Sequence, residues 1–222
     1  MAYFPFFVDI ENQDCLIVGG GIVALRKVEV LIGYGPRITV VSPEIEAELE
    51  VAAKGAASQE GTAGPKGRVI LQKRPFSISD LDNRDFVVAA TDDEALNRQI
   101  SEECRRRRIP VNVVDVQKEC SFIFPSIVRE GDIVVGISSG GKSPTVTQYL
   151  KKQVREGIPE GYGHLVEQLG DYRDYVKARV ADVADRTVIF RRMVDVGRAH
   201  GCCLTDELVD KLIEEVLAEK QA

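Results

Sequence analysis

The chain has 222 residues, of which 44% are hydrophobic and 29% are charged, a composition typical of a soluble globular protein. Its net charge of −6 disfavours a general nucleic-acid-binding role, and no apolar run approaches the roughly 18 residues needed to cross a bilayer. The five cysteines form no CxxC pair and the first residues contain no basic, apolar leader, so we expect a cytoplasmic protein with reduced thiols and without a membrane or nucleic-acid partner.

The elements at the start of the chain are typical of a βαβ unit. The aromatic opening, Tyr3–Ile10, is β-prone and leads into a turn. A short apolar strand then runs into Gly19–Gly21, and the helix that follows ends near Ile32. A second β-rich run, Arg37–Val41, arrives at the distance expected of a βαβ unit.

The glycines after the first strand fit the dinucleotide-binding pattern G-x-G-x-x-(G/A). Gly19 permits a tight turn, Gly21 removes the side chain where a pyrophosphate approaches, and Ala24 lets the helix pack closely on the strand. The phosphates would lie at the helix N-terminus, where unpaired N–H groups and the helix dipole favour an anion. The residues expected at the cofactor in this loop are Gly19, Gly20, Gly21, Ile22 and Val23.

The acidic residue that commonly follows the second strand of such a unit is absent here. Ser42 occupies its place, followed by Pro43 and Glu44, and we expect all three at the cofactor. Hydrogen bonds to the ribose could come from Ser42, from Glu44 or mainly from the backbone. The residues therefore leave the choice between NAD and NADP open.

Strands and helices continue to alternate as far as residue 115. The elements expected after the second strand are a helix over Glu44–Ala53, a mobile surface insertion over Lys54–Gly67, strands over Val69–Arg74 and Asp85–Ala90, a helix over Glu94–Arg108 and a strand over Val111–Val114. This alternation predicts an α/β fold with a Rossmann-like, doubly wound parallel sheet.

Polar side chains follow the carboxyl ends of several predicted strands, where ligands bind in such sheets. Thr91 and Asp92 come after one buried strand, and we expect both at the cofactor. Asp115 ends the last strand and is placed to move protons, although a capping or turn-forming role is the structural alternative. The sequence thus predicts a crevice between these turns and the glycine loop.

The pattern changes after Asp115. Two β-rich runs, Phe122–Arg129 and Asp132–Ser138, predict a hairpin, and a second glycine loop follows it. The helices expected beyond that loop cover Pro144–Glu156, His164–Val183, Asp185–Gly197 and Glu207–Lys220, the last capped by Thr205.

The second glycine loop matches the P-loop pattern, since Gly136–Ser143 reads G-x-x-x-x-G-K-S. A P-loop domain would continue with further α/β units and a magnesium-binding aspartate, whereas the chain beyond this loop is helical. We therefore prefer a loop whose backbone N–H groups and Lys142 hold a carboxylate-rich ligand. The two histidines, His164 and His200, show no ligand spacing, so we expect no protein-bound metal.

Several stretches, in the right order between about Pro5 and Leu150, resemble one known family. They are Cys15–Gly21 with Ala24, Arg26 and Lys27, then Ala89–Asp93, Asn112–Asp115, Ser121–Ser126, and Ser138–Gly141 with Ser143 and Pro144. Together they look like the dehydrogenase and chelatase module of siroheme synthase, the precorrin-2 dehydrogenase and sirohydrochlorin ferrochelatase family. One position departs from it: Ile22 stands where some members carry Asp, which leaves backbone contacts to the cofactor there.

The resemblance implies an NAD-dependent oxidation of precorrin-2, a tetrapyrrole, to sirohydrochlorin. It implies that Fe²⁺ can then be inserted in the same cleft to give siroheme, with the ion as a substrate rather than a bound cofactor. Asp115 would be the catalytic residue, as general base in the oxidation and as proton acceptor during chelation. The expected substrate-binding residues are Ser139, which matches the family's serine, and Gly140, Gly141 and Lys142.

The resemblance also implies a homodimer joined through about Lys118–Gln148. Because the sequence ends at Ala222 without a methyltransferase half, we expect a separate uroporphyrinogen methyltransferase upstream in the pathway. The expected division is a NAD-binding Rossmann domain over residues 1–117, a β-rich dimerisation segment with the substrate loop over 118–148, and a helical domain over 149–222. A dehydrogenase without chelatase activity and a non-catalytic NAD(H)-binding sensor remain alternatives.

Overall fold

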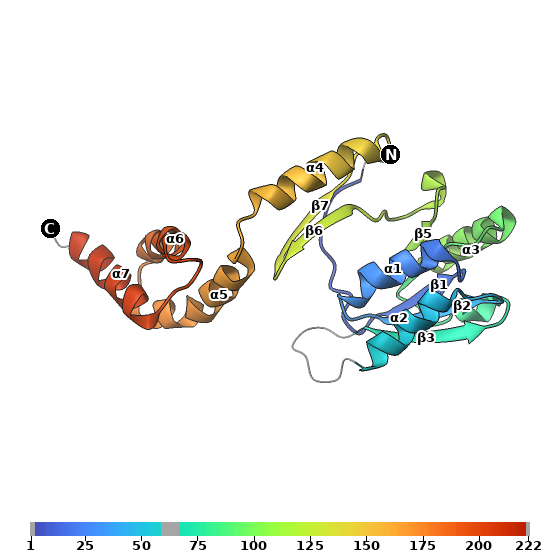
Figure 1. Ribbon diagram of the computed structural model, residues 1–222, viewed down its shortest axis with the longest axis horizontal. Coiled ribbons are helices and arrows are strands. Elements are labelled where there is room, and N and C mark those ends of the chain that lie inside the picture. The colour runs from blue at the N-terminus through green and yellow to red at the C-terminus, as the bar shows by residue number, and fades with distance from the viewer. Residues whose placement is uncertain (1–2, 59–66, 221–222) are drawn as a thin grey trace. The chain divides into compact units, whose positions relative to one another are not determined.

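The structure is a computed structural model that describes residues 3–58 and 67–220. The chain divides into two compact units, Met1–Phe124 and Pro125–Ala222 (Figure 1). The expected boundary after residue 117 lies within the first unit, and the one after residue 148 lies within a helix. The functional division into three parts therefore stays a prediction.

The first unit contains a five-stranded sheet with the order β3-β2-β1-β4-β5, in which every neighbouring pair is parallel. Its strands are β1 (Asp14–Val18), β2 (Arg37–Ser42), β3 (Arg68–Lys73), β4 (Phe86–Ala89) and β5 (Val111–Val113). Its helices are α1 (Ile22–Ile32), α2 (Ala47–Ser58) and α3 (Glu94–Arg107), with 3₁₀ turns η1 (Ile78–Leu81) and η2 (Gln117–Glu119). The predicted doubly wound parallel sheet is confirmed.

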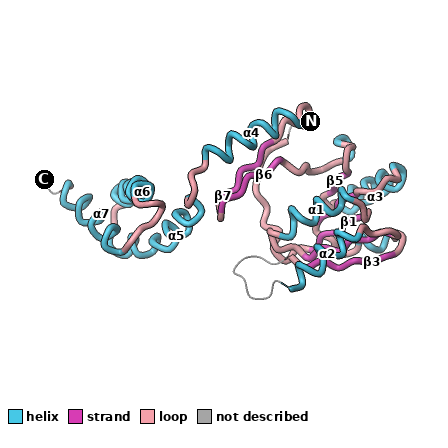
Figure 2. Tube along the Cα trace, in the orientation of Figure 1, coloured by secondary structure: helices cyan, strands magenta, loops and turns pink. Residues whose placement is uncertain are grey.

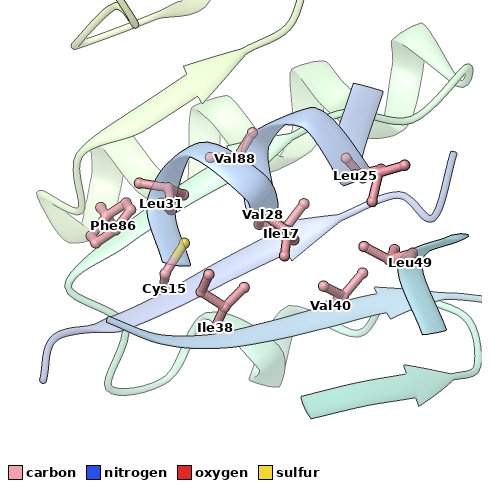
Figure 3. Packing of buried hydrophobic residues seen from close by; sticks show 11 residues of the cluster. Cys15, Ile17, Leu25, Val28, Leu31, Ile38, Val40, Leu49, Phe86 and Val88 are labelled. Atoms are coloured by element: carbon pink, nitrogen blue, oxygen red, sulfur yellow. The ribbon is translucent and has the colours of Figure 1, made fainter. Parts of the chain in front are cut away.

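Apolar residues cover both faces of this sheet, because each face packs against helices. On one face Ile17 and Val40 pack against Val28 of α1 and Leu49 of α2 (Figure 3). The opposite face packs against α3, whose Ile100 and Cys104 are fully buried. Burying one such aliphatic side chain stabilises the fold by roughly 1.5–3 kcal/mol. The central strands are therefore held firmly, and they fix the position of the loops that begin at their carboxyl ends.

Some predicted elements of the first unit are wrong. Tyr3–Ile10 forms no strand, and the side chains of Phe4, Phe6 and Phe7 are exposed, because no neighbouring strand pairs with this segment. The helix expected over Glu44–Ala53 begins at Ala47 and runs to Ser58, so the first part of the expected insertion Lys54–Gly67 is helical. The remainder of that insertion, residues 59–66, lies outside the described residues.

The second unit begins with the predicted hairpin, β6 (Ser126–Glu130) and β7 (Ile133–Ile137), which pair antiparallel across Gly131. In Figure 2 these two strands are magenta and the helices that follow them are cyan. Those helices are α4 (Pro144–Gly157), α5 (Tyr162–Arg179), α6 (Val183–Ala199) and α7 (Asp206–Glu219). The last three share a core around Val176, Ile189 and Met193. Thr205 caps α7 as predicted, since its side chain accepts a hydrogen bond from the Leu208 N–H.

None of the helices in the described ranges combines the length and the apolar character needed to span a bilayer. All five cysteines are free thiols.

Candidate functional site

The glycine loop after β1 is held between the ends of β4 and β2. The Gly19 N–H donates to the Val41 carbonyl at 3.0 Å, and Gly19 has a φ of +119°. A side chain on Gly19 would overlap the carbonyl oxygen of Ala90, and one on Gly20 would overlap that of Glu44. The first two glycines are therefore required by the packing of the sheet edge.

Gly21 is different, because a Cβ atom there would have no protein atom within 4 Å. It is the N-cap of α1 and provides no side-chain cap, and the first turn of α1 contains no acidic residue. The first N–H groups of a helix have no intrahelical partner, so they and the helix dipole attract an anion. The open side of Gly21, next to Ile22 and Val23, is thus where an approaching phosphate group fits best.

The turn after β2 lies against the glycine loop. The Glu46 N–H donates to the Gly20 carbonyl at 2.9 Å, which holds the turn in place. Ser42 is half-buried, whereas Pro43 and Glu44 are exposed. Ser42 is also in register with Lys73 on the neighbouring strand β3. A carboxylate and an ammonium group therefore both belong to this end of the sheet.

The turn after β4 is organised by Asn97, a residue of α3 that the sequence did not single out. Its side-chain amide donates to the Thr91 carbonyl at 2.8 Å, and the Thr91 hydroxyl donates to Asn97 Oδ1 at 2.8 Å. Asn97 is only 5% exposed. Asp93 caps α3 through the N–H groups of its first turn, while Asp92 stays exposed. Asn97 thus fixes the backbone of Thr91 beside the glycine loop.

Asp115 follows β5 in a tight turn with a φ of +60°, a left-handed conformation that Asp tolerates better than most residues. The strand itself ends at Val113, one residue earlier than predicted. The 3₁₀ turn that follows has no side-chain cap, so Asp115 does not cap it, whereas its left-handed backbone does fit the turn-forming alternative. Its exposed carboxylate makes no hydrogen bond or ion pair with the residues that the structure describes, which leaves it available to a ligand.

Lys27 of α1 lies near Asp115 and was not predicted as a site residue. Its Nζ lies 4.0 Å from the centre of the Phe124 ring. Burial lowers the pKa of Lys27, and the nearby charge of Asp115 opposes that shift. The contact between Lys27 and Phe124 joins residues far apart in the sequence, so the sequence pattern could not predict it. The one hint that Lys27 belongs to the site was its presence among the residues that resemble the family.

Cys120 follows Asp115 by five residues, directly after the 3₁₀ turn η2. Its thiol donates to the Val113 carbonyl at 3.1 Å, and its sulfur accepts from the Val113 N–H at 3.2 Å. Burial raises the pKa of this thiol, which disfavours the thiolate. Cys120 therefore ties the loop to the end of β5 rather than acting as a nucleophile.

The second glycine loop belongs to the second unit. Gly140 and Gly141 have positive φ values of 62° and 78°. The Ser139 hydroxyl oxygen accepts from the Ser143 N–H at 2.9 Å, and Ser143 caps α4. Lys142 is exposed. The strand before this loop pairs only antiparallel, in a two-stranded hairpin, unlike the parallel sheet of a P-loop domain.

The predicted site residues of the first unit thus gather at one edge of the sheet. The loops after β1, β2 and β4 touch one another, and Asp115 joins them at the end of β5, beside Lys27. Within the described residues no group of three or more His, Cys, Asp or Glu side chains could hold a metal ion. The arrangement suits a dinucleotide with a reacting group next to a carboxylate.

Residues 6–126 match a family described as "Putative NAD(P)-binding". The chain is similar to siroheme synthase of Nitrosospira multiformis, with 40% identity over 194 residues that cover 87% of this chain and 40% of the relative. It is also similar to siroheme synthase of Thioalkalivibrio sulfidiphilus, with 41% identity over 197 residues, 88% of this chain and 38% of the relative. The chain therefore spans about two fifths of the length of these relatives.

A solved structure named "SirC, precorrin-2 dehydrogenase" shares the fold. The two chains superimpose with a TM-score of 0.69 at 22% identity, over 97% of this chain and 100% of the other. These matches confirm the family that the sequence pattern indicated, with a cofactor of the NAD(P) type.

Proposed function

The chain belongs to this NAD(P)-binding family, and from that premise we propose that it oxidises precorrin-2 to sirohydrochlorin with NAD⁺, in siroheme biosynthesis. The names of the relatives support the pathway and the substrate. The observation that carries the proposal is the carboxylate of Asp115, which no described residue engages, at the same sheet edge as the open side of Gly21.

The oxidation removes one hydride and one proton from the macrocycle. Bound NAD⁺ supplies the hydride acceptor at its nicotinamide ring. Gly21 and the N-terminus of α1 bind the pyrophosphate, and the turn at Thr91 and Asp92, held by Asn97, borders the cofactor. Asp115 accepts the proton as general base.

Ser139–Lys142 are proposed to bind the substrate's carboxylates. The two left-handed glycines shape a loop closed by its own hydrogen bonds, such as the one from the Lys142 N–H to the Ser139 carbonyl, and the exposed Lys142 side chain adds a positive charge. A charge-assisted hydrogen bond from an ammonium or N–H group to a carboxylate is about twice as strong as a neutral one.

Insertion of Fe²⁺ into sirohydrochlorin is proposed as a second activity of the same site. The macrocycle nitrogens would be the ligands and would lose two protons, which Asp115 could accept or relay. A dehydrogenase without this second activity is the alternative, since Asp115 serves the first step in either case.

One series of spectra tests these proposals. Precorrin-2 and NAD⁺ are mixed with the protein, and Fe²⁺ or Co²⁺ is added afterwards. We expect NADH together with the sirohydrochlorin spectrum, then a metallated spectrum that forms faster than without protein. Binding of NAD(H) without any turnover would replace the proposal by a sensor role, and metallation at the protein-free rate would remove the chelatase step.

Glu44 is expected to favour NAD⁺ over NADP⁺. Its turn lies against the glycine loop, where a carboxylate can accept a hydrogen bond from the ribose and repel a 2′-phosphate. Because a hydrogen bond to a charged group contributes about 1.5–3 kcal/mol, Glu44→Gln should reduce the NAD⁺ preference roughly tenfold or more.

The measurement is kcat/KM with each nucleotide. Glu48→Gln, which changes an exposed acid in the first turn of α2, is the control and should keep the preference. An unchanged preference in Glu44→Gln would assign the discrimination to Ser42 or the backbone.

We propose a homodimer that uses the hairpin and α4. No residue of α4 is buried, and Val146, Tyr149 and Leu150 are 50%, 64% and 39% exposed. Exposed apolar residues grouped on one helix are typical of an interface. Charging a central interface residue costs about 2 kcal/mol or more, roughly a 30-fold loss of affinity.

The double variant Val146→Asp and Leu150→Asp should therefore shift the mass in light scattering from dimer toward monomer at low protein concentration. Val183→Asp, at an exposed position of α6, is the matched control. A variant that remains as dimeric as the control would place the interface elsewhere.

We place the reaction in the cytoplasm, where free cysteines stay reduced. We also propose that a separate uroporphyrinogen methyltransferase supplies precorrin-2.

A further inference from the structure

Lys27 is a half-buried lysine whose ammonium group makes no hydrogen bond or ion pair with the residues that the structure describes. An ammonium group has three donors, and a lysine side chain ordinarily extends until its charged end reaches water. Here the amine instead lies over the face of Phe124. The cation–π contact offsets part of the hydration that the ammonium loses on burial, but the ring provides no conventional acceptor for its three N–H donors.

The ring beneath Lys27 is held firmly in place. Phe124 meets Phe122 edge to face with 5.4 Å between ring centres, and Phe122 meets Phe86 with 6.3 Å. The Asn112 side chain donates to the Phe122 carbonyl at 3.0 Å, which ties this segment to β5. The position of the ammonium is therefore built by the fold and does not depend on a loose surface side chain.

Two titratable groups lie close enough to the ammonium to influence its pKa: the carboxylate of Asp115 and the thiol of Cys120. Neither forms an ion pair with Lys27, although Asp115 is close enough to influence its protonation. Cys120 is engaged with Val113. A ligand bound beside Asp115 can therefore supply, in place of water, the acceptors that Lys27 lacks within the described chain.

The cofactor's pyrophosphate is a poor candidate for that acceptor. Lys27 is five residues beyond Ile22, where α1 begins, which places its Cα about 7.5 Å along the helix from the N-terminus that binds phosphate. Its amine lies over Phe124 and is close enough to Asp115 for the two charges to interact.

We propose that Lys27 binds a carboxylate of the tetrapyrrole and so holds the macrocycle next to Asp115. The inference rests on the proposed function and adds a specificity-determining residue to it. A carboxylate restores the hydrogen bonds that burial removes from the ammonium. Because the two side chains come from different elements, α1 and the turn after β5, a macrocycle bound by one is oriented for proton transfer to the other.

Steady-state kinetics of Lys27→Met test this role. We expect the KM for precorrin-2 to rise roughly tenfold or more, with kcat changed far less and the KM for NAD⁺ within twofold. Lys27→Arg should recover much of the loss, because it keeps the charge. Arg26→Met, at an exposed neighbour on α1, is the control and should resemble the wild type.

A pH series separates binding from a merely structural effect. Lysine is charged below its pKa, and burial lowers that pKa, so wild-type affinity for sirohydrochlorin should fall with rising pH earlier than an ordinary lysine would allow. This loss should move to higher pH in Lys27→Arg and be absent in Lys27→Met. Fluorescence titration with sirohydrochlorin gives the affinities without turnover.

An unchanged KM for precorrin-2, or a parallel loss of NAD⁺ binding and thermal stability, would overturn the role of Lys27. A wild-type protein that binds sirohydrochlorin but oxidises no precorrin-2 would instead overturn the proposed function, and the titrations would still decide the role of Lys27. Absence of sirohydrochlorin binding together with absence of NADH formation from precorrin-2 would overturn both.

Discussion

Replacing Asp115 with asparagine should lower kcat for precorrin-2 oxidation by about 10²- to 10⁴-fold while NAD⁺ binding is retained, since removal of a general base typically has this effect. The carboxylate is exposed, makes no hydrogen bond within the described chain and lies at the ligand-binding edge of the sheet. The measurements are the rate of NADH formation from precorrin-2 and NAD⁺, and the dissociation constant from an equilibrium titration with NADH.

Asparagine is the right substitution because the backbone at position 115 is left-handed, with a φ of +60°. Asn adopts this conformation with little strain, whereas Ala adds a cost of roughly 1–2 kcal/mol that would mix stability with catalysis. Asp171→Asn, at an exposed position of α5, is the matched control and should keep full activity. Turnover by Asp115→Asn at the wild-type rate would remove the residue from the mechanism.

The fold could be predicted because its strands are apolar and its turns are rich in glycine. Phe86–Ala89 is buried along its whole length, as a central parallel strand must be, and the sequence shows this directly. Tyr3–Ile10 has the same β-prone composition and yet forms no strand. A strand needs a partner to satisfy its backbone, and composition gives no information about which partners the fold supplies.

The start of α2 illustrates a second limit. Glu44 and Glu46 favour a helix N-terminus, but the chain there is held against Gly20 by the hydrogen bond from the Glu46 N–H. The helix begins only at Ala47. A contact between two loops thus decides the boundary, and local propensity cannot anticipate it.

The candidate site was predictable as far as it follows from strand order. Residues after parallel strands converge on one edge, so the glycine loop, Thr91 and Asp115 could be grouped from the sequence. Asn97 and Lys27 could not, because each acts from a helix whose orientation is set by packing. Their contacts with Thr91 and Phe124 depend on the tertiary structure.

A substitution at the first glycine of the loop should mainly reduce stability, and one at the third should mainly reduce NAD⁺ binding. Gly19→Ala should destabilise the fold by about 3 kcal/mol, because its Cβ would overlap the Ala90 carbonyl and the residue has a φ of +119°. For a chain of this size that corresponds to a fall of about 6–12 °C in Tm. Gly21→Val should keep most of the stability, since a Cβ there has no protein atom within 4 Å.

Gly21→Val should instead weaken NAD⁺ binding more than tenfold, because its side chain would occupy the space where the pyrophosphate reaches the N-terminus of α1. Thermal unfolding and NADH titration of both variants separate the two effects. Gly170→Ala, in the middle of α5 where a Cβ meets nothing, is the control and should affect neither NADH binding nor stability adversely. Wild-type NADH affinity in Gly21→Val would mean that the dinucleotide does not bind at this loop. A valine side chain next to a bound phosphate would overlap it and weaken NADH binding.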